Sequence, residues 1–129
     1  MVEKRDKEDY DVIYYVINCL IEKKEEVIMD EMYFTITGCN YYFGNRFMEK
    51  GMKVKLVKEP DNEYDKEAIQ VKIKGLGKVG YVANSPYTVK GESMSAGRLY
   101  DRLGNKAKGK IEFVIGGGAI CKIVDNGIE

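Results

Sequence analysis

The most constraining feature of this sequence is segment 52–74, in which two stretches of alternating polarity flank a polar turn. The first stretch alternates three apolar side chains, expected inside, with three lysines, expected outside: Met52, Val54 and Leu56 against Lys53, Lys55 and Lys58. The second stretch places Ile69, Val71 and Ile73 on its buried face. A period of two residues is typical of strands with one buried face. The segment therefore predicts a strand, a turn ending in Tyr64-Asp65, and a second strand.

Further alternating stretches predict a mainly β protein. Strands are expected over residues 33–38, 78–83, 110–115 and 119–124, separated by glycine-rich turns. A short helix is expected before Leu103, capped by Ser93 or Ser95 and ended by Gly104-Asn105. Six short strands with one internal helix indicate a partly open, six-stranded β-barrel of the OB or SH3-like kind.

The first 31 residues differ in composition from the rest. Asp9 or Asp11 is placed to cap a helix running from about Val12 to Glu26, although the run at 12–17 is also rich in strand-forming residues. We expect an acidic N-terminal helical extension over residues 1–31 and a barrel domain over residues 32–129. The helix would pack on the barrel or pair with a second copy in a homodimer.

The net charge of zero hides an asymmetry. Residues 1–31 contain ten acidic and five basic residues, whereas residues 32–129 contain sixteen basic and eleven acidic residues. A basic body favours an anionic partner such as nucleic acid, and an excess of this size is also compatible with an ordinary solvated surface.

The residue inventory argues against catalysis. There is no histidine, which removes the commonest general base and the commonest metal ligand. The three cysteines, Cys19, Cys39 and Cys121, lack C-x-x-C spacing and are expected to be reduced, buried thiols. We therefore expect no enzyme activity, no cofactor and no metal site.

Two motif matches are rejected on context. Residues 75–80 read G-x-G-x-x-G, but a strand follows where a dinucleotide site needs a helix, so we interpret them as a hairpin turn. Residues 61–72 begin like a calcium loop, but Lys66 replaces the required glycine and Lys72 the terminal glutamate.

No targeting or membrane segment is expected. Residues 1–11 carry mixed charges and no apolar core of a signal peptide. The longest apolar run, residues 12–21, is about half the length needed to span a bilayer and includes Asn18. A cytoplasmic protein without membrane contact is therefore expected.

Tyrosines gather near the predicted turns and strand ends of the basic body: Tyr41, Tyr42, Tyr64, Tyr81 and Tyr87. Flat side chains beside a positive groove can stack on unpaired bases. The alternative is that these are ordinary strand residues with amphipathic rings.

Three segments together resemble the HIRAN domain, a small β-barrel module found in certain helicase-like DNA repair ATPases. They are the run T-G-C-N-Y-Y-F-G at 37–44, the run P-D-N-E-Y-D-K-E-A-I-Q-V at 60–71 and V-G-Y-V at 79–82. The resemblance covers residues 33–124 and implies a module that binds the 3′ end of single-stranded DNA. It implies that Tyr41 and Tyr42 contact the terminal nucleotides, that Tyr64 stacks on the last base, and that Asp65 accepts a hydrogen bond from the 3′-hydroxyl.

The chain departs from the DNA-binding members at two positions. They have an arginine before the tyrosine pair, where this chain has Asn40, and a lysine after the Val-Gly segment, near Asn84. Other basic residues would have to contact the phosphates: Arg46, Lys66, Lys90 or Arg98. The run 93–98 also offers a helix start beside Arg98, either as an anion site or as a simple cap.

We therefore expect a binding module for single-stranded DNA ends, with candidate contacts at Asn40, Tyr41, Tyr42, Tyr64, Asp65, Lys66, Tyr81 and Arg98. For Asp65, a bond that closes its own turn remains the alternative. A DNA-processing ATPase or nuclease would act as a partner in DNA repair. The alternative function is a protein-interaction module of the same fold whose nucleotide pocket has decayed.

Overall fold

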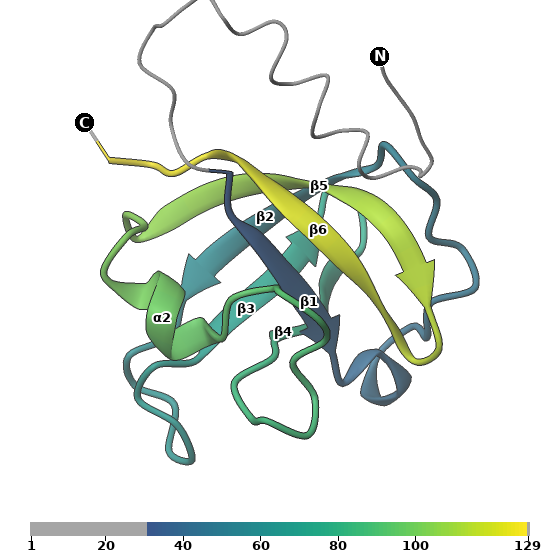
Figure 1. The fold of residues 1–129 in the computed structure, drawn as a ribbon. Helices are drawn as coiled ribbons and strands as arrows, with labels where there is room; N and C mark the ends of the chain where they lie inside the picture. Colours follow the sequence, from purple (N-terminus) through teal and green to yellow (C-terminus); the bar gives the residue numbers. More distant parts are fainter. Residues whose placement is uncertain (1–30, 129) are drawn as a thin grey trace, which may run out of the picture. The chain divides into compact units, whose positions relative to one another are not determined.

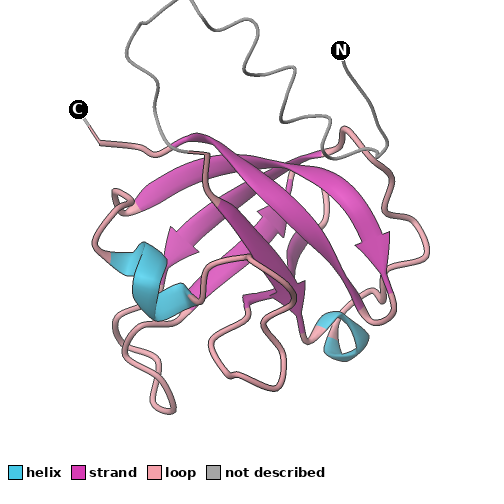
Figure 2. Cartoon of the chain, viewed as in Figure 1, coloured by secondary structure: helices cyan, strands magenta, loops and turns pink. Residues whose placement is uncertain are grey.

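The computed structural model describes residues 31–128, which form a six-stranded antiparallel barrel (Figures 1 and 2). The strands are β1 (Tyr33–Thr37), β2 (Lys53–Lys58), β3 (Ile69–Ile73), β4 (Gly77–Val82), β5 (Lys106–Ile115) and β6 (Gly118–Asp125). The helical segments are the 3-10 turn η1 (Cys39–Tyr41) and the helix α2 (Ala96–Tyr100). The predicted N-terminal helix lies outside the described residues.

The barrel is closed, so the prediction of a partly open barrel was wrong. The strand order is β1-β4-β3-β2-β5-β6, and β1 pairs with both β4 and β6. β5 is four residues longer at its start than predicted, and it pairs with β2 through residues 106–110 and with β6 through residues 108–115. Register shifts at Lys108/Gly109 and Ile111/Phe113 accompany this double pairing. Such bulges bend and twist a strand, which lets β5 turn the sheet back onto itself.

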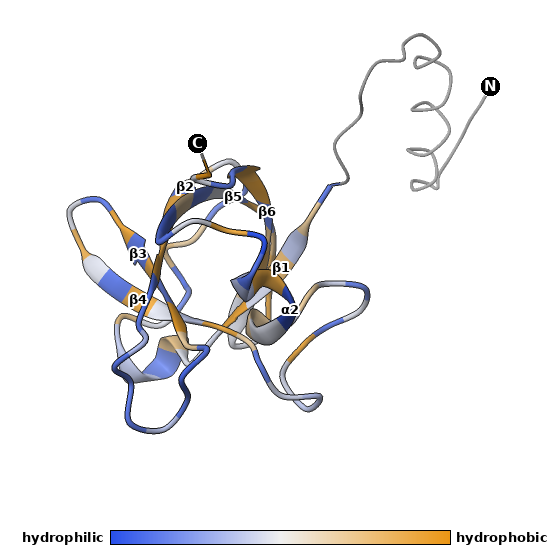
Figure 3. Cartoon of the chain, turned by 90° about the vertical axis from the view of Figure 1, so that its left-hand side faces the viewer, coloured by the Kyte–Doolittle hydropathy of each residue, from blue (hydrophilic) through white to orange (hydrophobic). Residues whose placement is uncertain are grey.

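The strand alternation predicts the core correctly. Val54 and Leu56 on β2 are buried, as are Ile69, Val71 and Ile73 on β3. Met52 is only partly buried and packs against this core. Figure 3 shows the alternation as orange and blue stretches along the strands. Burying an aliphatic side chain contributes about 1.5–3 kcal/mol, so these inward residues hold the barrel together.

The helix α2 forms in the expected segment, but it ends at Tyr100, before the predicted stop at Gly104-Asn105. The side chain of Ser95 accepts a hydrogen bond from the Arg98 N–H, so Ser95 rather than Ser93 is the cap. Ala96 and Leu99 are buried and belong to the core cluster. Cys39 and Cys121 are buried and unbonded, as predicted, and burial raises the pKa of both thiols. None of the helices in residues 31–128 is long and apolar enough to cross a membrane.

Candidate nucleic-acid interface

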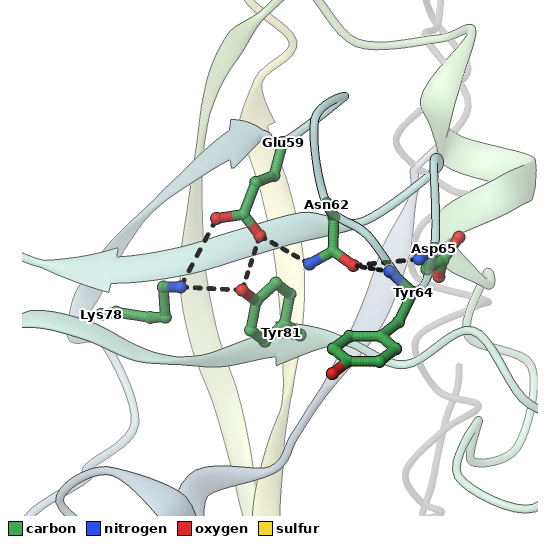
Figure 4. Close-up of polar contacts among 6 residues, drawn as sticks. All are labelled: Glu59, Asn62, Tyr64, Asp65, Lys78 and Tyr81. Carbon is green, nitrogen blue, oxygen red and sulfur yellow. Dashed lines mark hydrogen bonds and ion pairs between the residues drawn. The ribbon is translucent and has the colours of Figure 1, made fainter.

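The loop between β2 and β3 is organised around the side chain of Asn62. Its Oδ1 accepts hydrogen bonds from the backbone N–H groups of Tyr64 (2.8 Å) and Asp65 (2.9 Å). Its Nδ2 donates to Glu59 Oε1 at 2.9 Å. The loop is closed at its base by the Glu59 N–H, which donates to the carbonyl of Ala68. Asparagine is favoured in turns because its short amide bonds to the backbone in this way, and here it fixes the two residues expected to contact DNA (Figure 4).

The carboxylate of Asp65 holds its own turn and a neighbouring loop. Its Oδ1 accepts from the Glu67 N–H and its Oδ2 accepts from Asn84 Nδ2, both at 2.9 Å. The turn-closing bond that the sequence left as an alternative is therefore present. A carboxylate offers about four lone-pair sites, so two remain for a ligand. The structural and binding roles of Asp65 are compatible.

Asn84 connects this carboxylate to the start of α2. While its Nδ2 donates to Asp65, its Oδ1 accepts from the Gly97 N–H at 2.8 Å. The Ala96 N–H donates to the Ala83 carbonyl, and the Arg98 N–H donates to Ser95. The N–H groups of Ala96, Gly97 and Arg98 thus have protein acceptors and are not free for the anion site that was one of two alternatives for residues 93–98. The simple cap is the correct alternative.

A second polar cluster lies between the loop and β4. The Tyr81 hydroxyl donates to Glu59 Oε1 at 2.6 Å and accepts from Lys78 Nζ at 2.7 Å (Figure 4). Lys78 Nζ also lies 3.5 Å from Glu59 Oε2 and 5.8 Å from the centre of the Tyr42 ring. This cluster links the β2–β3 loop to β4 and to the segment after β1, and it holds the Tyr81 ring in one orientation.

The cluster shifts the pKa of each of its members. Hydrogen bonds from Tyr81 and Asn62 lower the pKa of the Glu59 carboxyl. The bond to Tyr81 raises the pKa of Lys78, and burial together with the bond to Glu59 raises the pKa of Tyr81. At neutral pH the cluster contains a carboxylate, an ammonium and a neutral phenol, so its net charge is zero.

These elements enclose an open hollow of about 560 Å³, which we call the tyrosine pocket. It is lined by Thr37, Tyr42, Asn62, Tyr64, Asp65, Ala68, Tyr81, Val82, Asn84 and Ser85. The Tyr64 side chain is 89% exposed, whereas Tyr42 is 41% exposed. The hollow therefore offers flat aromatic surfaces and one carboxylate, a combination suited to a base and a hydroxyl group.

The predicted contact residues divide into two groups. Tyr42, Tyr64, Asp65 and Tyr81 line the tyrosine pocket together. The remaining four do not line it: Asn40, Tyr41, Lys66 and Arg98. Tyr41 is 87% exposed at the end of η1, beside Tyr42. No lysine or arginine lines the tyrosine pocket in the part of the chain that the structure describes.

The residues that organise the pocket were not predicted from the sequence. Asn62 was visible as a turn residue after Pro60-Asp61, but its three hydrogen bonds were not foreseen. Asn84 was noted only as a missing lysine. The pairing of Glu59 with Tyr81 joins residues 22 positions apart, so no local pattern signals it.

The model of the HIRAN domain family matches residues 29–113. The crystal structure of the HIRAN domain of human HLTF is 22% identical, with a TM-score of 0.50, and the match covers 72% of this chain and 74% of that one. A protein from Lactobacillus plantarum is 22% identical, with a TM-score of 0.51 and coverage of 73% and 93%. No curated protein sequence matches the chain.

Proposed function

Because this chain belongs to the HIRAN domain family, known as a DNA-binding module, we propose that it binds the 3′ end of single-stranded DNA in the tyrosine pocket. The main structural support is that Asn62 fixes the backbone of Tyr64 and Asp65 side by side at the mouth of this pocket. The module binds without catalysis, and any remodelling of the DNA end belongs to a partner ATPase or nuclease.

The exposed ring of Tyr64 is suited to stack on the last base. Aromatic stacking on a base contributes about 1–3 kcal/mol, and it tolerates any base because all have a flat face. Tyr42 and Tyr81, more buried in the same pocket, supply the wall against which the terminal sugar would lie.

The carboxylate of Asp65 supports selectivity for a free 3′-hydroxyl. An ionised carboxylate only accepts hydrogen bonds, and it has lone pairs free after its bonds to Glu67 and Asn84. A terminal phosphate in place of the hydroxyl would bring two anionic groups together in a pocket whose described lining contains no lysine or arginine. A blocked 3′ end should therefore bind more weakly.

The test is fluorescence anisotropy with a short single strand whose 3′ end is either free or phosphorylated. We expect Tyr64→Ala to weaken binding of the free end by about 5- to 150-fold, the equivalent of one lost stacking contact. Tyr87→Ala is the matched control, because Tyr87 is also 89% exposed but does not line the tyrosine pocket.

Asp65→Ala should abolish the difference between the free and blocked ends. End recognition would be rejected if DNA affinity were the same with a free or phosphorylated 3′ end and were unchanged by Tyr64→Ala and Asp65→Ala. Such a result would favour the alternative of a protein-interaction module on the same fold.

A further inference from the structure

Lysines form rows across the outer face of the four adjacent strands β5, β2, β3 and β4. One row crosses all four strands, because Lys108 is opposite Lys55, Lys55 is opposite Lys72, and Lys72 is opposite Lys78. Beside it, Lys110 is opposite Lys53. Neighbouring strands lie about 4.8 Å apart, so the longer row spans roughly 14 Å.

Four of these lysines, together with Lys74, line a hollow of about 500 Å³. It is lined by Lys53, Lys55, Lys74, Lys108 and Lys110, together with Val54, Gly109 and Val124. We call this group of five lysines the lysine face. No carboxylate lines the hollow, and within residues 31–128 none of the five lysines forms an ion pair. Asp125 on β6 is opposite Lys108, and its carboxylate accepts a hydrogen bond from the Gly127 N–H.

This arrangement is unfavourable for the barrel alone. Like charges directly opposite each other on neighbouring strands are destabilising. A surface that only has to be soluble does better with both signs of charge interspersed. A polyanion bound across the rows would relieve the repulsion, which points to a ligand that carries regularly spaced negative charges.

The long lysine row, which shares Lys55 and Lys108 with the lysine face, leads toward the tyrosine pocket through the register of the sheet. In the next row Gln70 is opposite Tyr81, whose ring lines the tyrosine pocket. Lys78, at the end of the long lysine row, has its Nζ 4.7 Å from the centre of the Tyr81 ring and 5.8 Å from that of Tyr42. The pocket has no lysine or arginine of its own in its described lining, so phosphate contacts have to come from a neighbouring surface.

We propose that the lysine face binds the sugar–phosphate backbone of the same DNA strand, on the 5′ side of the nucleotide in the tyrosine pocket. This inference rests on the proposed function. The part of the row that forms no ion pair within residues 31–128, from Lys108 to Lys72, spans about 10 Å and is long enough to meet about three phosphates, which are about 3.4 Å apart along the axis of a stacked strand. A membrane surface is disfavoured because the lining carries no large apolar or aromatic side chain for insertion between lipids.

The experiment compares the full chain with the double variant Lys55→Gln/Lys108→Gln, which removes two facing charges. The probes are single strands of about 3 and about 15 nucleotides, each with a free or phosphorylated 3′ end, and the longer strand exceeds the reach of the pocket alone. The matched control is Lys50→Gln/Arg102→Gln, which removes two exposed charges outside these strands.

For the longer strand we expect the double variant to bind roughly tenfold more weakly, with its log–log salt slope reduced by about 1.4, because each lost phosphate contact lowers the slope by about 0.7. For the shorter strand, and for the control variant, affinity and slope should stay near those of the wild type. The double variant should unfold at the same or a slightly higher temperature, since it relieves repulsion, so weaker binding would not reflect misfolding.

The two proposals fail in different ways. In one outcome the double variant binds the longer strand more weakly, but affinity is the same with a free and with a phosphorylated 3′ end. This outcome supports the lysine face and rejects end recognition. An unchanged affinity and salt slope in the double variant overturns the lysine face, whatever the 3′ end does. The lysine-face proposal is also overturned if the double variant binds DNA normally but no longer binds phosphatidylserine vesicles. That result would make the face a membrane surface.

Discussion

At the scale of single residues, Asn62 is the centre of the site. It joins the backbone of Tyr64 and Asp65 to the carboxylate of Glu59, and Glu59 in turn binds Tyr81 on β4. The aromatic and acidic groups at the pocket mouth are therefore held by a side chain that would not itself stack on a base.

Replacing Asn62 by alanine should weaken DNA binding more than it destabilises the fold. The change removes three hydrogen bonds at a half-buried position, so we expect a loss of about 1–2 kcal/mol in the free energy of unfolding. Chemical denaturation and anisotropy on the same variant measure the two effects. Glu63→Ala is the control in the same loop, because Glu63 is exposed and makes no side-chain hydrogen bond among the described residues. Unchanged DNA binding in Asn62→Ala would contradict this role.

Glu59 should make the stability of the protein depend on pH. Its folded pKa lies below the ordinary value of 4.5 because Tyr81 and Asn62 donate to the carboxylate. A lowered folded pKa contributes stability above the unfolded pKa, and this contribution is lost as the pH falls through the folded pKa. Wild type should therefore exceed Glu59→Gln by about 1 kcal/mol at neutral pH, and by less below about pH 4.5.

Urea denaturation of wild type, Glu59→Gln and Glu63→Gln over this pH range measures the effect. The Glu63 variant should track the wild type throughout. A constant difference between wild type and Glu59→Gln at every pH would show that the carboxylate charge contributes nothing.

At the scale of elements, the pocket depends on the close approach of β4 to β1. A Cβ at Gly80 would lie 2.6 Å from the Thr37 carbonyl oxygen and 2.8 Å from Ile36 Cγ2. Gly80→Ala should therefore cost about 1–3 kcal/mol of stability, as expected for an overpacked site. Gly116→Ala is the control, because nothing lies within 4 Å of a Cβ there and its backbone has no positive φ. Equal thermal unfolding midpoints for the two variants would contradict the inferred crowding.

The sequence was sufficient to predict the elements but not their closure. Strand alternation is local, and it located all six strands and the inward residues of β2 and β3. Closure depends on β1 pairing with both β4 and β6 and on the bulges of β5. These pairings join segments far apart in the chain, so no local pattern specifies them.

The same limit applies to the binding surfaces. The family resemblance led to three of the pocket residues, Tyr42, Tyr64 and Asp65, and the gathering of tyrosines near strand ends led to a fourth, Tyr81. The outward lysines of β2 were also expected. The alignment of these lysines with the lysines of β3 and β5 follows only from the observed register, in which Lys55 is opposite both Lys72 and Lys108. A surface shared by three strands is invisible until the strands are paired.

At the scale of the whole molecule, the net charge of zero conceals a basic surface on the barrel whose five lysines form no ion pair within residues 31–128. Added salt screens repulsion between exposed charges. Raising sodium chloride from about 50 mM to about 500 mM should raise the thermal unfolding midpoint by about 2–4 °C in wild type. The increase should be smaller in Lys55→Gln/Lys108→Gln, and equal increases in the two proteins would argue against repulsion across the lysine face.

The central claim, that a DNA 3′ end occupies the tyrosine pocket, is tested most directly by an amide chemical-shift titration with a strand of about three nucleotides, the length at which the pocket should dominate binding. We predict saturable shifts at Asn62, Tyr64, Asp65, Tyr81 and Asn84, and much smaller shifts when the 3′ end is phosphorylated. Shifts confined to other surfaces, or the same shifts with either 3′ end, would contradict it.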